Sequence, residues 1–387
     1  MVTGTEGKTG RWWPTAAVGA GVIALCYGFA RYAYGLFVPR FSETFGLTTV
    51  AVGVLGGLST AGYGLGLLGS PRTSAWSARG TVLLAGAAAT AGLALMAVAP
   101  NVAVFGAGIV IAGGSAGLVS PGVAQLIGET AGRRVRARAQ TWANTGTGLG
   151  LAASAFTPLL LLGWPAIWAA FAVLGAALTL IAWRTLPRTD PAEVVTGSAH
   201  GVLPLVLNSV LIGVTSAPYW TFSSSRLTES GLSPVAATWC WFTIGVAGLL
   251  GGSAGRVAER VGLRAANLAT WTLAAAGIAV LALPDPGLPG ALVSGALFGC
   301  TYMALTGLCI LWASRVFPTR PARGVTWSFL GLGIGQTAAS PLAGATASAI
   351  GLAAVFGLTG LVALIAWSQV HPRAAPPEHR GVRRLRR

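Results

Sequence analysis

Residues 137–150 read ARAQTWANTGTGLG, and residues 322–335, at a constant offset of 185, read ARGVTWSFLGLGIG. Seven of the fourteen aligned positions are identical, among them an Arg, a Thr-Trp pair and three alternate glycines. This agreement exceeds chance even in a chain with 56 glycines among 387 residues. The two segments therefore predict an internal repeat with one copy in each half of the chain.

The composition around this repeat is that of a polytopic membrane protein. Hydrophobic residues make up 54% of the chain and charged residues only 9%, and the mean hydropathy is +0.71. The first apolar run lacks a small-residue cleavage site, so we expect a retained helix and not a signal peptide. Apolar runs long enough to cross a bilayer predict twelve transmembrane helices, near 14–38, 47–69, 80–98, 101–125, 139–163, 165–185, 202–224, 233–255, 265–283, 287–312, 322–346 and 349–369.

The positive charges indicate how these helices are oriented. With both termini in the cytoplasm, all 25 Lys and Arg residues except Arg31, Arg40 and Arg226 fall on the cytoplasmic side, as the positive-inside rule requires. The net charge of +16 thus reflects topology and not nucleic-acid binding, which would need a basic stripe on a solvated domain. We expect a monomeric multi-pass protein of the bacterial inner or plasma membrane, surrounded by the lipid bilayer.

The repeat predicts how the twelve helices are grouped. A period of six spans returns the second copy in the same orientation as the first, which indicates two pseudo-symmetric six-helix halves. The predicted halves are residues 1–186 and 202–387, the second with a basic tail. The polar, proline-bearing segment 187–201 between them, PRTDPAEVVTGSAHG, has the composition of a cytoplasmic linker.

A short motif between the eighth and ninth predicted spans indicates a family. Residues 255–264 read GRVAERVGLR and resemble the G-x-L-A-D-R-x-G-R signature of the major facilitator superfamily, with Glu259 in the place of the usual Asp. The resemblance implies a two-half transporter fold with a charge latch at its cytoplasmic mouth, in which we expect Glu259 to pair with Arg138. The same offset maps Glu259 to Ser74, so this latch is one-sided. The candidate gating residues are Glu259, Arg260, Arg264, Arg138 and Arg323.

A second resemblance lies in the first span. Residues 28–41, GFARYAYGLFVPRF, look like the G-x-x-R-[FY]-[AG]-[YF]-x-x-x-x-P pattern of the poorly characterised YbfB-like branch of the same superfamily. The likeness implies the fold and a transport role, but it implies no particular substrate.

This span carries a charge where a charge is costly. Arg31 lies nine residues before Arg40, about 13 Å below the outer end of the helix. An arginine at that depth costs at least ~2.5–3.5 kcal/mol and persists only where it faces a bundle interior or a wet cavity. Helical spacing places Tyr27, Arg31 and Tyr34 on one face. Either the guanidinium binds a carboxylate or similar oxyanion of a substrate, or it bonds to carbonyls and hydroxyls of a neighbouring helix and fixes packing.

Other polar and aromatic residues within the predicted spans are candidates to line the same cavity. For any single one of them the alternative is a hydrogen bond that bridges two helices, but together they suit an organic solute. They are Gln125 and Asn144 in the first half and Asn208, Tyr219, Trp220, Trp239, Trp241, Tyr302 and Gln336 in the second.

Titratable groups are scarce inside the predicted spans. All nine acidic residues and all three histidines fall in loops, tails or span ends, and the four cysteines lack metal-ligand spacing. A membrane enzyme would need a cluster of such groups, so we expect no catalytic residue, metal or cofactor. A proton-coupled carrier would also show a buried acid or histidine, which leaves anion exchange, facilitated diffusion or a proton carried with the substrate as forms of coupling.

These observations predict a secondary transporter of a small organic solute, anionic if Arg31 binds it, that works by alternating access between two halves. The alternative is a multidrug or metabolite efflux pump with a mainly hydrophobic cavity, in which Arg31 is structural.

Overall fold

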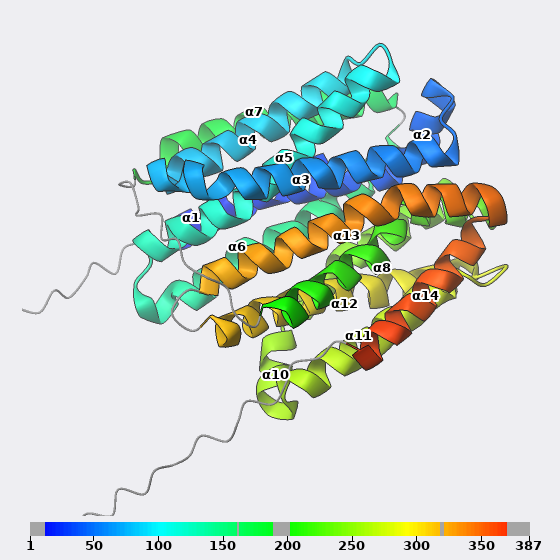
Figure 1. Ribbon diagram of the computed structural model, residues 1–387. Coiled ribbons are helices and arrows are strands. Elements are labelled where there is room, and N and C mark those ends of the chain that lie inside the picture. Colours follow the sequence, from blue (N-terminus) through cyan, green and yellow to red (C-terminus); the bar gives the residue numbers. More distant parts are fainter. Residues whose placement is uncertain (1–11, 161, 189–201, 318–320, 370–387) are drawn as a thin grey trace, which may run out of the picture.

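In the computed structural model, residues 12–160, 162–188, 202–317 and 321–369 are described, and these residues form a bundle of helices without strands (Figure 1). The N-terminal helices are α1 (Trp12–Ile23), η1 (Ala24–Tyr32), α2 (Ala33–Phe45), α3 (Thr49–Trp76), α4 (Ala78–Ala97), α5 (Val102–Thr130), α6 (Arg133–Ala155), η2 (Thr157–Leu159) and α7 (Trp164–Thr185). The C-terminal helices are α8 (Leu203–Glu229), α9 (Pro234–Gly251), α10 (Ala254–Val261), α11 (Leu263–Val280), α12 (Gly287–Val316), α13 (Pro321–Ile350) and α14 (Leu352–Gln369).

The helices have the length and composition of membrane spans. Nine helical segments among the described residues are long and apolar enough to cross a bilayer, when α1, η1 and α2 are taken as one continuous segment. Three further helices, α6, α13 and α14, pack in the same bundle. The all-helical membrane fold is therefore confirmed. Twelve spans stay a prediction, because α6, α13 and α14 are not among the nine apolar segments. Cytoplasmic termini stay a prediction as well, since residues 1–11 and 370–387 lie outside the described residues.

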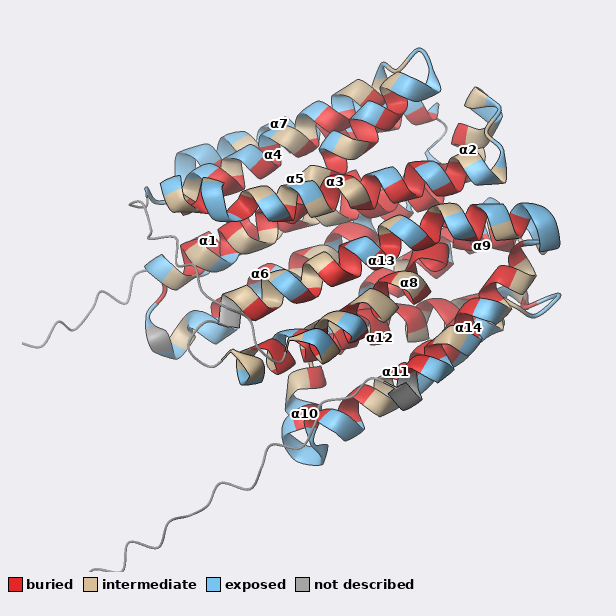
Figure 2. Cartoon of the chain, in the orientation of Figure 1, coloured by how far each residue is buried: buried red, intermediate tan, exposed pale blue. Residues whose placement is uncertain are grey.

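The surface of the bundle is apolar, as a lipid-facing surface must be. Figure 2 shows exposed positions along the outer faces of the helices and buried ones where helices meet. Large hydrophobic side chains lie on the outer faces, among them Leu65, Val173, Leu250 and Leu361, each more than half exposed. Such a surface is stable in hydrocarbon, where the helices satisfy their own backbone hydrogen bonds.

One predicted span is shifted along the chain. The fifth was expected at 139–163, but α6 covers Arg133–Ala155 and is followed by the short helix η2. Pro158 lies in η2, and proline cannot donate the backbone hydrogen bond that would continue an α-helix. Pro158 therefore accounts for the early end of the helix, while its start at Arg133 lies inside the Arg-rich segment.

The N-terminal and C-terminal helices meet chiefly along three helix pairs, α3 with α13, α6 with α9 and α2 with α8, and Figure 1 shows α3 and α13 side by side. In α3 the closest approach involves Gly53, where an added Cβ would lie 2.5 Å from the backbone carbonyl oxygen of Ser340 in α13. In α6 it involves Gly148, close to Gly245 of α9. These glycines lie toward the helix ends opposite to the arginine-bearing ends of α3 and α6, and we call that side of the bundle the far side.

Candidate functional site

Arg31 lies in a distorted stretch of the first span. Residues Ala24–Tyr32 form a π-helix, which closes with a hydrogen bond from the Ala33 N–H to the Gly28 carbonyl. A π-helix bonds five residues back instead of four, is rare, and often marks a functional site. The extra residue per turn changes which side chains share a face. It places Arg31 at the boundary between the N-terminal and C-terminal helices.

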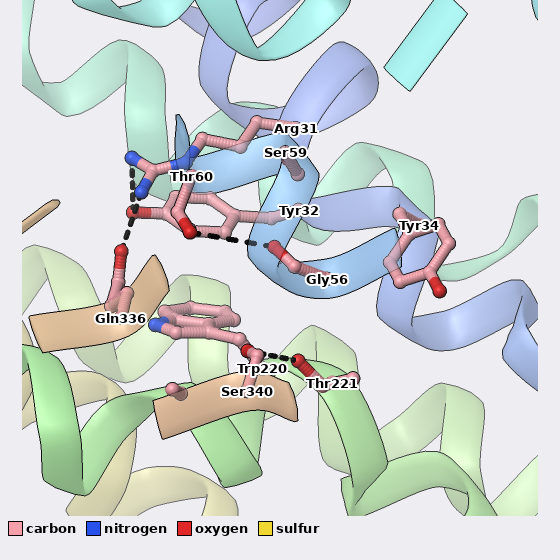
Figure 3. Close-up of a pocket in the computed structure, with 11 residues that line it drawn as sticks. Arg31, Tyr32, Tyr34, Gly56, Ser59, Thr60, Trp220, Thr221, Gln336 and Ser340 are labelled. Carbon is pink, nitrogen blue, oxygen red and sulfur yellow. Dashed lines mark hydrogen bonds between the residues drawn. The ribbon is translucent and has the colours of Figure 1, made fainter. Parts of the chain in front are cut away.

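The Arg31 guanidinium has only neutral partners among the described residues. Its Nη2 donates to Oε1 of Gln336 at 2.6 Å, and its Nη1 donates to the Tyr32 hydroxyl at 3.4 Å (Figure 3). Three tyrosine rings surround its Cζ atom, those of Tyr63 at 4.1 Å, Tyr32 at 5.1 Å and Tyr27 at 5.8 Å. A cation over an aromatic face contributes roughly 0.5–2 kcal/mol. The guanidinium is thus stabilised by contacts with tyrosine rings, and no described carboxylate neutralises its charge.

Arg31 is 5% exposed, and its Nε–H has no hydrogen-bond partner among the described residues. The contrast with Arg226, which is 4% exposed, is informative. The Arg226 Nε donates to the Leu281 carbonyl at 2.9 Å, and its Nη2 donates to the carbonyls of Leu283 and Pro284. Arg226 shows the backbone-bonded geometry expected of a purely structural arginine, and Arg31 does not share it.

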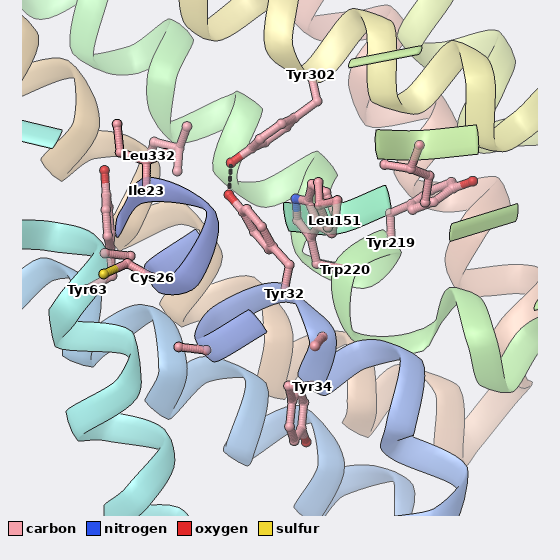
Figure 4. Packing of buried hydrophobic residues seen from close by; sticks show 14 of the residues in the cluster. Ile23, Cys26, Tyr32, Tyr34, Tyr63, Leu151, Tyr219, Trp220, Tyr302 and Leu332 are labelled. Carbon is pink, nitrogen blue, oxygen red and sulfur yellow. Dashed lines mark hydrogen bonds between the residues drawn. The ribbon is translucent and has the colours of Figure 1, made fainter. Parts of the chain in front are cut away.

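The contacts of Arg31 cross between the two groups of helices at mid-depth. Gln336 is near the middle of α13, and its Nε2 donates to the Ser216 hydroxyl of α8 at 3.0 Å. The Tyr32 and Tyr302 hydroxyls lie 3.1 Å apart (Figure 4), and the Tyr32 ring stacks on Trp220 with centroids 4.0 Å apart. A chain of polar and aromatic contacts therefore ties η1 to α8, α12 and α13.

A cavity of about 30 Å³ lies beside Arg31, bordered by residues of η1, α2, α3, α8 and α13. This volume holds one or two water-sized groups, so it admits a carboxylate but not a whole organic solute. The indole Nε1 of Trp220, which borders the cavity, also lacks a hydrogen-bond partner among the described residues. The residues that line the cavity are Arg31, Tyr32, Tyr34, Gly56, Ser59, Thr60, Ala217, Trp220, Thr221, Gln336 and Ser340.

Of the substrate-binding candidates, Arg31, Tyr27, Trp220, Tyr302 and Gln336 come together in this cluster. The structure corrects the expected face of the first helix for Tyr34. Its hydroxyl donates to the Val52 carbonyl and its ring stacks on Phe41, so Tyr34 borders the cavity without flanking the guanidinium (Figure 3). The π-helix between Tyr27 and Tyr34 is the physical reason.

Two further candidates lie elsewhere. Asn144 is exposed on α6 and accepts a hydrogen bond from Gln140 at 3.0 Å. Tyr219 is fully buried, stacks on Phe298 with centroids 3.7 Å apart, and bonds to the Ser294 hydroxyl. Figure 4 shows its hydroxyl pointing away from Tyr32. In this conformation neither side chain contacts Arg31.

The candidate gating residues do not form a latch here. Glu259 and Arg260 are exposed on α10, and Arg264 is exposed in the first turn of α11. The expected pair of Glu259 with Arg138 is absent, because α10 packs on α11 and α12. The Arg138 guanidinium instead lies 5.6 Å from the Trp12 ring. Arg323 is half-buried near the start of α13. A latch by these residues stays a prediction for a conformation in which the arginine-bearing side is closed.

The sequence alone missed three members of the cluster, Tyr32, Tyr63 and Ser216. Tyr32 was not among the candidates, and spacing gave no reason to choose it, because adjacent residues of a helix point to different faces. Tyr63 offered a usable signal, since the chain has only six tyrosines and this one lies inside a predicted span. Ser216 offered none, because a serine in a span usually bonds to its own helix.

The fold is that of a helical membrane protein with a polar cluster between its two groups of helices. Residues 20–322 match the family model described as Major Facilitator Superfamily, and the chain therefore belongs to that superfamily. Its membership indicates a transporter and not an enzyme. No curated protein matches the sequence significantly.

Solved structures of transporters share the fold across nearly the whole chain. A D-xylose-proton symporter superposes with a TM-score of 0.76 at 14% identity, covering 93% of this chain and 98% of its own. The nucleoside transporter NupG gives 0.73 at 13% identity, covering 92% and 98%. A bacterial homolog of the human lysosomal transporter Spinster, inward-facing and unoccupied, gives 0.69 at 15% identity, covering 93% and 95%. Identities this low establish the fold alone.

Proposed function

We propose that this protein is a secondary transporter of a small organic anion and that Arg31 binds the anion. The observation that carries the proposal is the Arg31 guanidinium, buried between helices of both groups with neutral partners and an unpartnered Nε–H. A buried charge without a counter-charge is costly. A substrate carboxylate would supply the missing charge.

The surroundings of Arg31 suit the rest of such a solute. The rings of Tyr27, Tyr32, Tyr63 and Trp220 form flat apolar walls around the charge. Because both groups of helices contribute, separating them on one side or the other exposes the site to alternate faces of the membrane, which is alternating access. One chain supplies every part of this site, so we propose a monomer in a cell membrane, on the YbfB-like branch that the first span resembles.

No described Asp, Glu or His contacts Arg31. The proposal therefore places no proton-binding side chain at the site. Exchange for a second anion, or entry of the anion together with its own proton, satisfies the charge balance. The direction of transport follows from the gradients of those species.

A second candidate function is a multidrug or metabolite efflux pump in which Arg31 is structural. The three tyrosine rings and Gln336 favour it, because they stabilise the guanidinium without any ligand. The anion transporter should bind an acid and not its neutral analogue, whereas the efflux pump should bind both equally well.

Thermal unfolding of the purified protein tests the proposal. Small monocarboxylates such as benzoate and lactate are compared with their amides, which have the same shape and no charge. A ligand at 100 times its Kd stabilises the folded state by ~2.7 kcal/mol, so at least one acid should raise the melting temperature while its amide does not. Arg31→Gln should abolish the shift, and Arg40→Gln, which removes an equal charge from an arginine bonded to the Pro158 carbonyl, should preserve it. Equal shifts with acids and amides would support the efflux pump instead.

A further inference from the structure

Two neighbouring nitrogens of the Arg31 guanidinium differ in their partners. The Nε–H and one Nη2–H of an arginine point in the same direction. The two oxygens of a carboxylate can accept parallel hydrogen bonds from this edge of the guanidinium. In the structure Nη2 donates to the Gln336 Oε1 at 2.6 Å, while Nε has no partner among the described residues. Of the two nitrogens that a carboxylate would bridge, one therefore has a single neutral acceptor and the other has none among the described residues.

A second hydrogen bond, to Ser216, holds the Gln336 side chain in this position. Gln336 is 1% exposed, and its Nε2 donates to the Ser216 hydroxyl at 3.0 Å. The amide oxygen has the acceptor chemistry of a carboxylate oxygen without the charge. Gln336 is thus a built-in neutral substitute for an anionic ligand of Arg31.

The space around this edge decides how an anion can bind. The cavity bordered by Arg31 and Gln336 measures about 30 Å³, which admits one or two water-sized groups. A carboxylate that bonds to both Nε and Nη2 in so small a space would meet the Gln336 oxygen, which already accepts a hydrogen bond from Nη2. This hydrogen bond joins η1 to α13, one from each group of helices.

We propose that the transported carboxylate and Gln336 compete for the same edge of Arg31, so that binding of the anion releases a tie between the two groups of helices. The proposal rests on the proposed function, since it takes Arg31 as the anion receptor. It also names the substrate class. The site selects a carboxylate, which fills both donors, over a monatomic anion such as chloride. The bound anion thereby removes the hydrogen bond that joins η1 to α13.

Removal of the competitor tests the inference, with benzoate as the probe and isothermal titration calorimetry as the assay. Gln336→Leu keeps a similar volume but cannot accept a hydrogen bond. A hydrogen bond to a charged donor is worth enough that its loss from the free protein should lower the benzoate Kd about tenfold. Ser216→Ala, which frees the amide without deleting it, should lower the Kd by a smaller factor. If Gln336→Leu fails to fold, Gln336→Asn withdraws the amide by one methylene and should shift the Kd in the same direction.

A matched control separates competition from general loosening of the bundle. The Thr337 hydroxyl lies 3.0 Å from that of Thr60, so these residues also link α13 to α3, without touching Arg31. Thr337→Val should leave the benzoate Kd within about twofold of the wild-type value.

The outcomes distinguish this inference from the proposed function. An unchanged or higher benzoate Kd in Gln336→Leu, with binding still abolished by Arg31→Gln, overturns the competition and leaves Arg31 as the receptor. Absence of benzoate binding in both the wild type and Gln336→Leu also overturns the competition. Benzoate binding that survives Arg31→Gln overturns the proposed function itself.

Discussion

A single methyl group at Gly35 should force the far side of the bundle open. Gly35 lies in α2, where a Cβ would overlap the Trp220 carbonyl oxygen of α8 and come within 2.9 Å of the Trp241 ring. One obstacle is backbone and the other is an indole with 1% exposure, so neither can yield cheaply. Overpacking of this kind costs about 1–3 kcal/mol. If only the conformation closed on the far side bears that cost, Gly35→Ala shifts the balance toward the open conformation by roughly 5- to 150-fold.

A cysteine in place of Ser224 reports this opening. Ser224 is 4% exposed, and its hydroxyl donates to the Leu36 carbonyl at 3.3 Å, across the contact between α8 and α2. In the Ser224→Cys background, Gly35→Ala should speed alkylation by a membrane-impermeant maleimide by a factor in that range. Gly64→Ala is the matched control, because a Cβ at Gly64 meets nothing within 4 Å. Equal alkylation rates for Gly35→Ala and Gly64→Ala, in proteins with the wild-type melting temperature, would refute the reasoning.

Substitutions at three further positions probe the contacts around and beyond the site. Tyr63→Leu removes the ring closest to the Arg31 charge and should lower the free energy of unfolding by about 0.5–2 kcal/mol, whereas Tyr63→Phe keeps the ring and should lose less than half as much. Asn208→Leu leaves the buried Trp271 indole N–H without its acceptor and should destabilise the protein by about 1–3 kcal/mol, seen as a lower melting temperature with an unchanged benzoate Kd. Glu259→Gln should slow transport in proteoliposomes without changing carboxylate binding, since Glu259 is exposed in this conformation; a weakened Kd would argue against a role confined to gating.

Hydropathy and the repeat predicted most of the helices, because burial in lipid imposes long apolar runs that are visible in any sequence. The burial of Arg31 inside the bundle was also predictable, since a charge inside such a run persists only where it faces a bundle interior or a wet cavity. The π-helix was not predictable, because its one-residue change of phase leaves no mark in composition. The Tyr34 hydroxyl bonds to the Val52 carbonyl and does not flank the guanidinium, although Tyr34 borders the same cavity.

The sequence also could not predict which residues of distant spans contact each other. Gln336 lies 305 residues from Arg31, and spacing within one helix carries no information about such a pair. The amides and rings of the spans gave a list of candidates, of which Gln336, Trp220 and Tyr302 contact the cluster and Asn144 and Tyr219 do not. Only the packing of α3, α8, α12 and α13 around η1 decides between them.

Uptake of radiolabelled benzoate into proteoliposomes tests the central claim, that Arg31 binds the transported anion, most directly. The account predicts saturable uptake by the wild type and by Arg40→Gln, and uptake no higher than that of protein-free vesicles by Arg31→Gln. Uptake by Arg31→Gln at the wild-type rate would contradict it.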